Sequence, residues 1–303
     1  MVKDLQKGDI VGVGPLRHNC GYCEKCKAGE DNLCITLQSA EKDIYVFNFG
    51  GWASHLQFPC HHVFKLPAGL DLATTPPIMC AGVTVFSPLN RYFKELGKGA
   101  HCGIMGIGGL GHLAIQYAKA LGYNVTALTQ YDDKIELCKQ LGASNVIVVD
   151  SKFNELKKHE GRFDIIINTI PASGNSFFDS YMTTVRRGGI FVQIGVPNVK
   201  EQINPSFFTL VSNQIRLVGS FIGAINETKE TLQFTADHKI KVMAEMFAFE
   251  DFPKALKRLE HEKPHFRCIV DCKSFVEKNF EAPEGKYTPT CSHPADCKKE
   301  ESK

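Results

Sequence analysis

The sequence predicts an α/β fold in which a small β-rich lobe accompanies a doubly wound parallel sheet. Between about residues 83 and 221, short apolar runs that suit buried strands alternate with loops and amphipathic stretches, the pattern of parallel βα units. Residues 109–121 place apolar side chains at the spacing of a helix that packs on a sheet. Residues 7–66 are instead rich in glycine, cysteine and short β-type runs, which predicts the smaller lobe.

Short apolar runs mark the expected strands. In the larger lobe these candidates are residues 102–105, 125–128, 146–149, 165–167 and 190–194. In the smaller lobe they are residues 10–13 and 62–65. After residue 226 come amphipathic stretches and a further β-type run, which we expect to return the chain to the smaller lobe: 227–238, 252–261 and 266–270.

These elements predict the domain boundaries. The smaller lobe combines residues 1–82 with 222–275, and the larger lobe spans 83–221. Residues 276–303 are mostly charged and poor in aliphatic side chains, which predicts a flexible tail without a core of its own.

Composition excludes several classes of function. The 303 residues are 43% hydrophobic, and the formal net charge of +2 provides no basic surface that would neutralise nucleic-acid phosphates. No apolar run approaches the ~20 residues that a membrane-spanning helix needs. Residues 1–9 lack the apolar core of a secretory signal, so a cytoplasmic location is expected, with neither nucleic acid nor membrane as a partner.

Four of the twelve cysteines crowd into one loop. Cys20, Cys23, Cys26 and Cys34 have the spacing C-x2-C-x2-C-x7-C, and four thiolates at such separations can close a tetrahedron around zinc. Because four protein ligands leave no open position for water or substrate, the predicted zinc is structural. The alternative is a cluster of free surface thiols, which would be open to oxidation.

A glycine-rich loop follows the first strand of the larger lobe. Gly106, Gly108 and Gly111 fit G-x-G-x-x-G, with Gly109 and Leu110 between the last two glycines. The loop lies between an apolar strand and an amphipathic helix, where glycines permit a tight turn, backbone approach to a pyrophosphate and close helix–strand packing. We therefore expect a dinucleotide site, the alternative being a turn that binds no nucleotide.

Cofactor choice is expected at the end of the next strand, where NAD sites present a carboxylate to the ribose 2′-hydroxyl. Here the strand ends in Thr129 and Gln130, and Lys134 lies one helical turn further on. Hydroxyl, amide and ammonium groups favour NADP. Asp132 and Asp133 could favour NAD. Their simpler interpretation is that they are the N-cap and first-turn acids of the following helix.

At this point the chain resembles the cinnamyl alcohol dehydrogenase branch of the zinc-containing medium-chain alcohol dehydrogenases. The resemblance extends to about Cys272 and is carried by these stretches, in order: 8–14, 20–34, 50–53, 80–89, 106–111 and 219–223. It implies a GroES-like β lobe beside a Rossmann lobe, with the cofactor in the cleft. It also implies a homodimer joined through the last Rossmann strand, around residues 215–218.

The resemblance also implies roles for single residues. Cys80, which by itself would be interpreted as a buried structural cysteine, matches the family's third protein ligand to a catalytic zinc. Thr84 matches a position beside the nicotinamide, and Arg267 one that approaches the pyrophosphate. Four further residues match the lining of the cofactor cleft: Gly195, Val196, Ser220 and Phe221.

The family's other catalytic zinc ligands, an early cysteine and a histidine in a Gly-His-Glu segment, have no match in this sequence. Both belong before the turn that is here Gly8-Asp9, and the sequence contains no Gly-His-Glu. His55, His61 and His62 are not expected to replace them. By resemblance, these histidines belong to a strand and a turn that lie away from the cleft. We therefore expect an incomplete catalytic zinc site.

Three hypotheses follow. The first is an NADP-dependent zinc alcohol dehydrogenase that interconverts primary alcohols and aldehydes by hydride transfer. The second is a catalytically inactive pseudoenzyme that serves as a structural or scaffold component, within a larger protein assembly. The third is a zinc-independent, quinone-reductase-like enzyme, which is disfavoured because such relatives usually lack the cysteine loop. The sequence does not identify the substrate.

Overall fold

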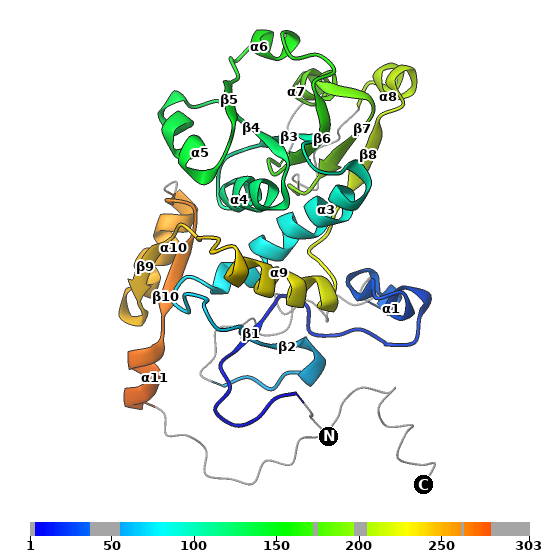
Figure 1. Cartoon of the computed structure of the whole chain (residues 1–303). Coiled ribbons are helices and arrows are strands. Elements are labelled where there is room, and N and C mark those ends of the chain that lie inside the picture. The colour runs from blue at the N-terminus through cyan, green and yellow to red at the C-terminus, as the bar shows by residue number, and fades with distance from the viewer. Residues whose placement is uncertain (1–3, 37–54, 172–174, 197–204, 262–263, 280–303) are drawn as a thin grey trace. The chain divides into compact units, whose positions relative to one another are not determined.

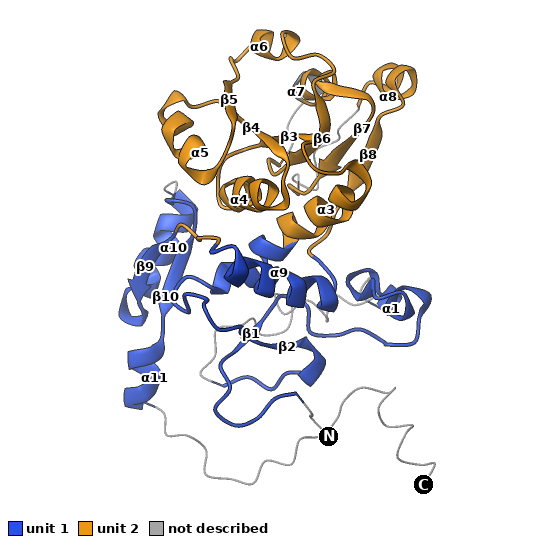
Figure 2. Ribbon diagram, in the orientation of Figure 1, with its two compact units in different colours: residues 1–83, 223–239, 244–303 blue, residues 84–222, 240–243 orange. Residues whose placement is uncertain are grey.

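The chain divides into two compact units in a computed structural model that describes residues 4–36, 55–171, 175–196, 205–261 and 264–279. Unit 1 comprises residues 1–83, 223–239 and 244–303, and unit 2 comprises 84–222 and 240–243 (Figure 2). Two of these boundaries lie one residue from the expected ones. Residues 240–243 were not predicted to join the larger lobe, but they belong to unit 2 although both flanking segments belong to unit 1.

Unit 2 contains a six-stranded parallel sheet in the order β5-β4-β3-β6-β7-β8 (Figure 1). Its strands are β3 (His101–Met105), β4 (Asn124–Thr129), β5 (Asn145–Val148), β6 (Phe163–Asn168), β7 (Val185–Gln193) and β8 (Arg216–Gly219). The chain starts in the middle of the sheet, runs to one edge, and then crosses to β6 and runs to the other. This order confirms the predicted doubly wound fold, and all five predicted strands of this lobe are present.

The helices of unit 2 surround this sheet (Figure 1). They are α3 (Ala81–Leu96, which begins in unit 1), α4 (Gly111–Leu121), α5 (Ile135–Leu141), α6 (Asn154–Lys157), α7 (Asn175–Met182) and α8 (Phe207–Asn213). Only α4 was predicted from its periodicity. Gly122 and Gly142 directly follow α4 and α5 as their C-cap residues. Their φ angles of +106° and +111° favour glycine, because a side chain would clash with the backbone there.

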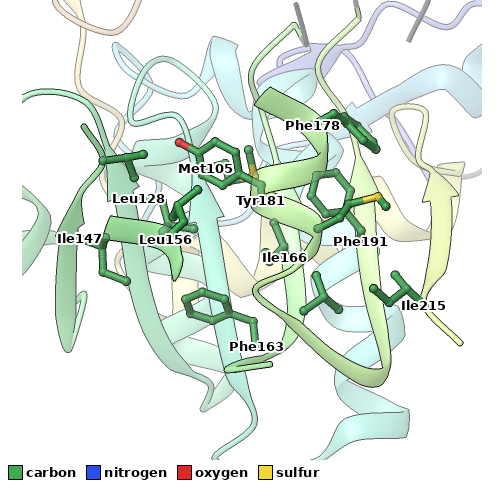
Figure 3. Close-up of a cluster of buried hydrophobic side chains, with 13 residues drawn as sticks. Met105, Leu128, Ile147, Leu156, Phe163, Ile166, Phe178, Tyr181, Phe191 and Ile215 are labelled. Atoms are coloured by element: carbon green, nitrogen blue, oxygen red, sulfur yellow. The ribbon is translucent and has the colours of Figure 1, made fainter. Parts of the chain in front are cut away.

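The core of unit 2 lies between the sheet and helix α7. Phe163, Ile166 and Phe191 project from β6 and β7, and all three are fully buried (Figure 3). Phe178 and Tyr181 of α7 cover them, and the rings of Phe178 and Phe191 lie 4.9 Å apart in a tilted arrangement. These continuous apolar runs are what a strand buried on both faces requires.

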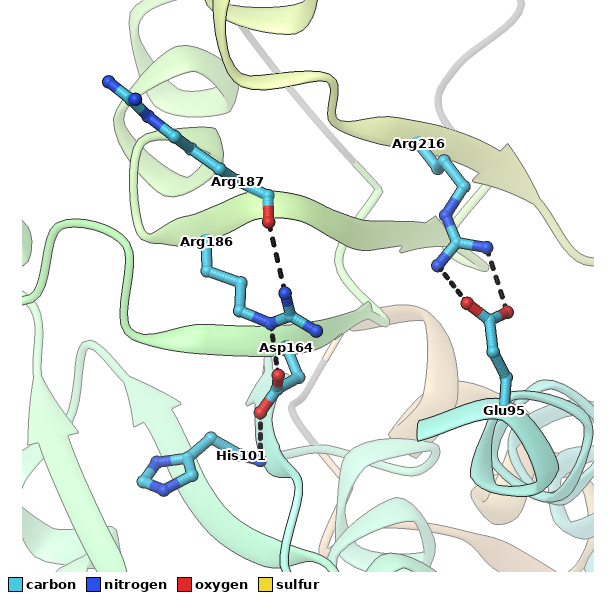
Figure 4. Close-up of polar contacts among 6 residues, drawn as sticks. All are labelled: Glu95, His101, Asp164, Arg186, Arg187 and Arg216. Carbon is cyan, nitrogen blue, oxygen red and sulfur yellow. Dashed lines mark hydrogen bonds and ion pairs between the residues drawn. The ribbon is translucent and has the colours of Figure 1, made fainter. Parts of the chain in front are cut away.

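Ion pairs join the elements near the amino ends of the strands (Figure 4). The Asp164 carboxylate accepts hydrogen bonds from the His101 backbone N–H, at 2.8 Å, and from the Arg186 side chain. Arg216 of β8 donates two hydrogen bonds to Glu95 of α3, at 2.9 and 2.6 Å, and these lower the pKa of Glu95. Since such exposed pairs contribute only about 0–1 kcal/mol each, the buried core is the main source of stability.

Unit 1 contains two small sheets. Strand β1 (Val11–Val13) pairs antiparallel with β2 (Val63–Lys65), and β9 (Glu245–Ala248) pairs parallel with β10 (Cys268–Asp271). Its helices are α1 (Glu24–Lys27), α9 (Ile225–Asp237), α10 (Phe252–His261) and α11 (Lys273–Asn279). Strand β9 was not predicted. No described helix combines the length and apolar character needed to cross a membrane.

Two predictions for this unit need correction. The run at residues 62–65 is not all strand, because His62 lies in a 3₁₀ turn (Cys60–His62) before β2. The predicted tail at 276–303 begins inside helix α11, and its remainder from residue 280 lies outside the described residues, as does the stretch 50–53.

Candidate nucleotide site and metal centre

The glycine loop lies at the carboxyl end of β3, where the strand order reverses. Strand β3 has β4 on one side and β6 on the other, so the helices that follow these neighbours lie on opposite faces of the sheet. Ligands of open α/β sheets bind in the crevice at this switch point, where the start of the next helix offers backbone N–H groups to phosphates. The loop therefore has the placement that a dinucleotide site needs.

The three motif glycines meet three different steric demands. Gly106 has a φ of +82°, and a Cβ there would lie 2.5 Å from the Ile170 side chain. A Cβ on Gly111 would lie 1.9 Å from the Gly106 carbonyl oxygen, so β3 and α4 can pack this closely only with glycine. A Cβ on Gly108 would have nothing within 4 Å, which leaves its backbone open to a ligand. This is the division of roles of a pyrophosphate-binding turn.

Polar residues that no sequence motif predicted shape the neighbouring strand ends, and Asn168 among them is fully buried. The Thr169 hydroxyl lies 2.8 Å from the carbonyl oxygens of both Met105 and Gly106. The Asn168 amide donates to the Gln193 side chain at 2.7 Å. Polar residues at the ends of apolar strands were the available signal, but only the sheet order shows that β6 and β7 place them beside the loop.

The end of β4 differs from the expectation at Thr129. Its side chain is buried, and its hydroxyl accepts the Tyr131 backbone N–H at 3.1 Å, so it supports the turn instead of facing outward. Gln130 is exposed. The Lys134 ammonium donates to the Ile107 carbonyl oxygen at 2.8 Å and lies 5.1 Å from the centre of the Tyr131 ring. The structure thus brings Lys134 to the glycine loop, whereas Asp132 and Asp133 begin a 3₁₀ turn.

Other predicted cleft residues follow the next strands. Gly195 and Val196 come directly after β7, and a Cβ on Gly195 would lie 2.3 Å from the Ile170 carbonyl oxygen. Ser220 and Phe221 follow β8, and the Ser220 N–H donates to the Gln193 carbonyl at 3.0 Å. Because carboxyl ends of parallel strands share one edge, these residues lie on the same edge of the sheet as the glycine loop. Thr84 is buried in α3.

The four predicted cysteines come together in unit 1. Their sulfur atoms all lie within 4.8 Å of one another, with Cys20 to Cys26 at 3.9 Å and Cys23 to Cys34 at 4.0 Å. A tetrahedral site with zinc–sulfur bonds of about 2.3 Å has sulfur–sulfur edges of about 3.8 Å. The cluster can therefore hold zinc with little rearrangement.

Polar neighbours surround this cluster. The His62 Nε2–H donates to the Asn19 side-chain oxygen at 3.2 Å, and the Asn19 amide donates to the Cys26 sulfur at 3.7 Å. Backbone N–H groups of Cys26 and Ile35 lower the pKa of Cys23 to about 6, which favours the thiolate that binds metal. Such outer groups orient metal ligands, and neither His62 nor Asn19 was predicted for this site from the sequence.

A buried carboxylate attaches the cysteine loop to helix α9. Asp31 accepts the backbone N–H of Ile225, the first residue of α9, at 3.0 Å. Burial raises the pKa of Asp31, and the hydrogen bond from Ile225 acts in the opposite direction. The position at a helix start also favours negative charge, so the loop is held by a contact that the zinc ligands alone do not provide.

The described residues do not form a catalytic zinc site around Cys80. Cys80 is exposed, which corrects the interpretation of a buried structural cysteine, although the protein around its thiol raises the pKa through desolvation. Arg267 lies near enough for its guanidinium to act against this shift. Among the described His, Cys, Asp and Glu side chains, the only ligand group of three or more is the Cys20–Cys34 cluster.

Comparisons with known proteins assign both units. Residues 1–68 match the family of the alcohol dehydrogenase GroES-like domain, and residues 109–237 match the family of zinc-binding dehydrogenases. A probable formaldehyde dehydrogenase of Bacillus subtilis (strain 168) is 34% identical over 276 residues, 89% of this chain and 76% of that protein. An aldehyde reductase of Escherichia coli (strain K12) is 33% identical over 281 residues, 91% of this chain and 79% of that protein.

Two solved structures extend this likeness to the fold. A cinnamyl alcohol dehydrogenase from Sorghum bicolor has a TM-score of 0.78 at 26% identity, over 93% of this chain and 79% of that chain. The CAD from Helicobacter pylori complexed with NADP(H) has a TM-score of 0.75 at 28% identity, over 89% of this chain and 77% of that chain. The predicted α/β fold with its GroES-like lobe is confirmed.

The cysteine cluster yields the first prediction. We expect Cys23→Ser to lose the zinc of this loop and to lower the Tm by at least about 5 °C, because metal binding contributes directly to folding. Cys60→Ser is the matched control, since Cys60 is a free cysteine outside the cluster. Elemental analysis and thermal denaturation of the purified chains give the answer. Zinc retained by Cys23→Ser, or lost equally from both variants, would contradict the assignment.

Proposed function

Because the chain belongs to the zinc-containing medium-chain alcohol dehydrogenases, in their cinnamyl alcohol dehydrogenase-like branch, we propose that it binds NADP and interconverts primary alcohols and aldehydes by hydride transfer. The observation that carries this proposal is the glycine loop, in which Gly106 and Gly111 permit the close packing of β3 and α4 while Gly108 stays open. In this proposal the pyrophosphate lies over the loop, at the start of α4.

Lys134 supports NADP over NAD. Its ammonium lies 2.8 Å from the Ile107 carbonyl, so a fixed positive charge stands between the glycine loop and the end of β4. That is where the adenosine ribose of a dinucleotide lies in this fold, and a 2′-phosphate there would gain a charge-assisted contact. Gln130, exposed beside it, can donate a further hydrogen bond. Asp132 and Asp133 would favour NAD only if one of them turned toward the ribose.

The remaining predicted residues would position the reacting end of the cofactor. When bound, the nicotinamide supplies or accepts the hydride. We assign Thr84, Gly195, Val196, Ser220 and Phe221 to the surroundings of the cofactor, and Arg267 to its pyrophosphate. Because the described residues offer only Cys80 to a catalytic zinc, no step of the proposed reaction runs through that metal. The cytoplasmic location remains a prediction.

Cofactor choice is tested at Lys134. We expect Lys134→Met to weaken NADPH binding at least about tenfold more than NADH binding, because only NADPH carries the 2′-phosphate, whereas loss of the contact to Ile107 affects both nucleotides. Lys139→Met is the control, since this lysine pairs with Glu136 on α5 at 2.8 Å. Titration followed by nucleotide fluorescence measures both affinities. A wild-type chain that binds NADH more tightly than NADPH would refute the NADP assignment.

Catalysis is tested by mixing the purified chain with NADPH and an aromatic aldehyde such as cinnamaldehyde. We expect oxidation of NADPH that requires the aldehyde and yields the alcohol in equal amount. In Gly108→Ala, folding should be retained because the new Cβ has open space, while turnover should fall at least about tenfold because that space is the proposed pyrophosphate seat.

Two outcomes would favour the other hypotheses. NADPH binding without turnover on any aldehyde would contradict the proposed activity and favour the inactive scaffold component, with a larger assembly as its partner. Turnover on a quinone in the presence of a chelator, without aldehyde reduction, would favour a quinone-reductase-like enzyme.

We also propose that two copies of the chain associate through the β8 edge of unit 2. In the described part of the chain, β8 pairs only with β7 and ends the sheet. Beside it, α8 exposes three large apolar side chains, Phe207, Phe208 and Val211, at 75%, 82% and 75% of their surface. An unpaired strand edge next to exposed apolar residues favours association with a second, identical edge.

A charged substitution in α8 tests this association. We expect the wild-type chain to be a dimer in light scattering and Phe208→Glu to be a monomer, because a carboxylate would be buried without a partner. Leu259→Glu is the control, since Leu259 is an exposed apolar residue of α10 in unit 1. A monomeric wild type, or dimeric Phe208→Glu, would exclude this interface.

A further inference from the structure

His112 is a fully buried histidine in the first turn of α4, directly after the glycine loop. Its Nδ1 lies 3.0 Å from the Gly108 carbonyl oxygen, and its Nε2 lies 3.1 Å from the Met243 backbone nitrogen. A carbonyl oxygen can only accept and a backbone N–H can only donate, so Nδ1 carries the hydrogen and Nε2 is the acceptor. The two partners therefore select one tautomer of a neutral ring.

This contact determines the direction of one peptide group in the loop. The Gly108 carbonyl oxygen accepts hydrogen bonds from both the ring and the backbone N–H of His112, the latter at 3.1 Å. In a trans peptide the carbonyl and the following N–H point in opposite directions. Holding the Gly108 carbonyl toward α4 thus directs the Gly109 N–H away from the helix, toward the side where the pyrophosphate is proposed to lie.

The same arrangement occurs at three successive carbonyl groups. Thr169 donates to the carbonyl of Gly106 at 2.8 Å, Lys134 to that of Ile107 at 2.8 Å, and His112 to that of Gly108 at 3.0 Å. The three donors come from three different parts of the chain, so each carbonyl is held separately. Because Gly108 has no Cβ contacts of its own, its peptide depends on the hydrogen bonds for its orientation.

The second nitrogen of His112 connects the loop to the returning segment 240–243. Gln116, one turn further along α4, exchanges two hydrogen bonds with Lys241, at 2.8 and 3.0 Å. Lys241 and Met243 are therefore both held by α4, but only Met243 is held by a residue that also contacts the glycine loop. Gln116 therefore serves as a control for His112, because it attaches the same segment without contacting the loop.

We propose that His112 is a positioning residue of the nucleotide site, which orients the Gly108–Gly109 peptide toward the pyrophosphate of the bound dinucleotide. This inference rests on the proposed dinucleotide binding. It assigns the effect to the Nδ1–H···O contact and not to the anchoring of segment 240–243. His112 does not touch the cofactor in this proposal, so its contribution is to loop geometry alone.

Two substitutions separate the two nitrogens. In His112→Asn the side-chain amide can replace Nδ1 as donor to Gly108, but it is too short to reach Met243. In His112→Gln the longer side chain can replace Nε2 as acceptor for Met243, but it does not supply the Nδ1 donor. Both variants place an amide in a buried site, so both should lower the Tm to a similar extent.

Dissociation constants for NADPH and NADH are then measured alongside the Tm. We expect His112→Gln to bind both nucleotides about tenfold more weakly, because each carries the pyrophosphate, and His112→Asn to stay within about threefold of wild type. Adenosine 2′-monophosphate, which lacks a pyrophosphate, should bind all three chains equally. Gln116→Met releases Lys241 and the His112 backbone carbonyl but leaves the His112 ring on Gly108, so it should leave nucleotide affinity unchanged.

Several results would overturn the inference. Wild-type affinity in His112→Gln, or equal weakening in His112→Asn and His112→Gln, would show that the ring acts only through stability or through segment 240–243. If neither variant folds, hydrogen exchange of the wild type decides: saturating NADPH should slow exchange of the Gly109 N–H, which the proposal directs toward the pyrophosphate, and unchanged exchange there would contradict the inference. A wild-type chain that binds no nucleotide at all would refute the proposed function, and would thereby be distinguished from failure of the His112 role.

Discussion

The close packing of the glycine loop against the start of α4 is the constraint on which the nucleotide site depends. The Gly106 carbonyl approaches Gly111 so closely that any side chain at Gly111 would place its first carbon 1.9 Å from that oxygen. This contact determines where α4 leaves the sheet, and with it where the first backbone N–H groups of the helix point. Because the motif glycines have no side chains to anchor them, neighbouring elements hold the loop carbonyls: Thr169, Lys134 and His112.

In unit 1 the cysteine loop is also held in place by contacts other than apolar packing. This loop has little apolar material, so the four sulfur atoms and their proposed zinc replace a hydrophobic core. The loop is also attached at its edge, where the buried Asp31 carboxylate accepts the first N–H of α9. Burial alone disfavours the Asp31 charge, and the backbone donor offsets part of this cost. In both units a loop is thus held by polar contacts from other segments.

The parts of this structure that could be predicted are those encoded by short patterns. Apolar runs located all five expected strands of unit 2, and the spacing of Cys20, Cys23, Cys26 and Cys34 located four sulfur atoms that do come together. Other features could not be predicted, because their local sequence is ambiguous. Thr129 seemed available to a cofactor, whereas its hydroxyl accepts the Tyr131 N–H, and Cys80 by itself suggested burial although it is exposed. Residues 240–243 carry no pattern that predicts their membership of unit 2.

The sequence by itself therefore determined the fold class, and it located the glycine loop and the four cysteines whose sulfur atoms lie together. These depend on side-chain period, glycine spacing and cysteine spacing, which act over a few residues and can be recognised along the chain. Only the tertiary structure decided which buried polar groups pair: His112 with Gly108 and Met243, or Asp31 with Ile225. Such pairs join residues up to 194 positions apart, and each buried group is stable only where the complete fold places a partner within hydrogen-bond distance.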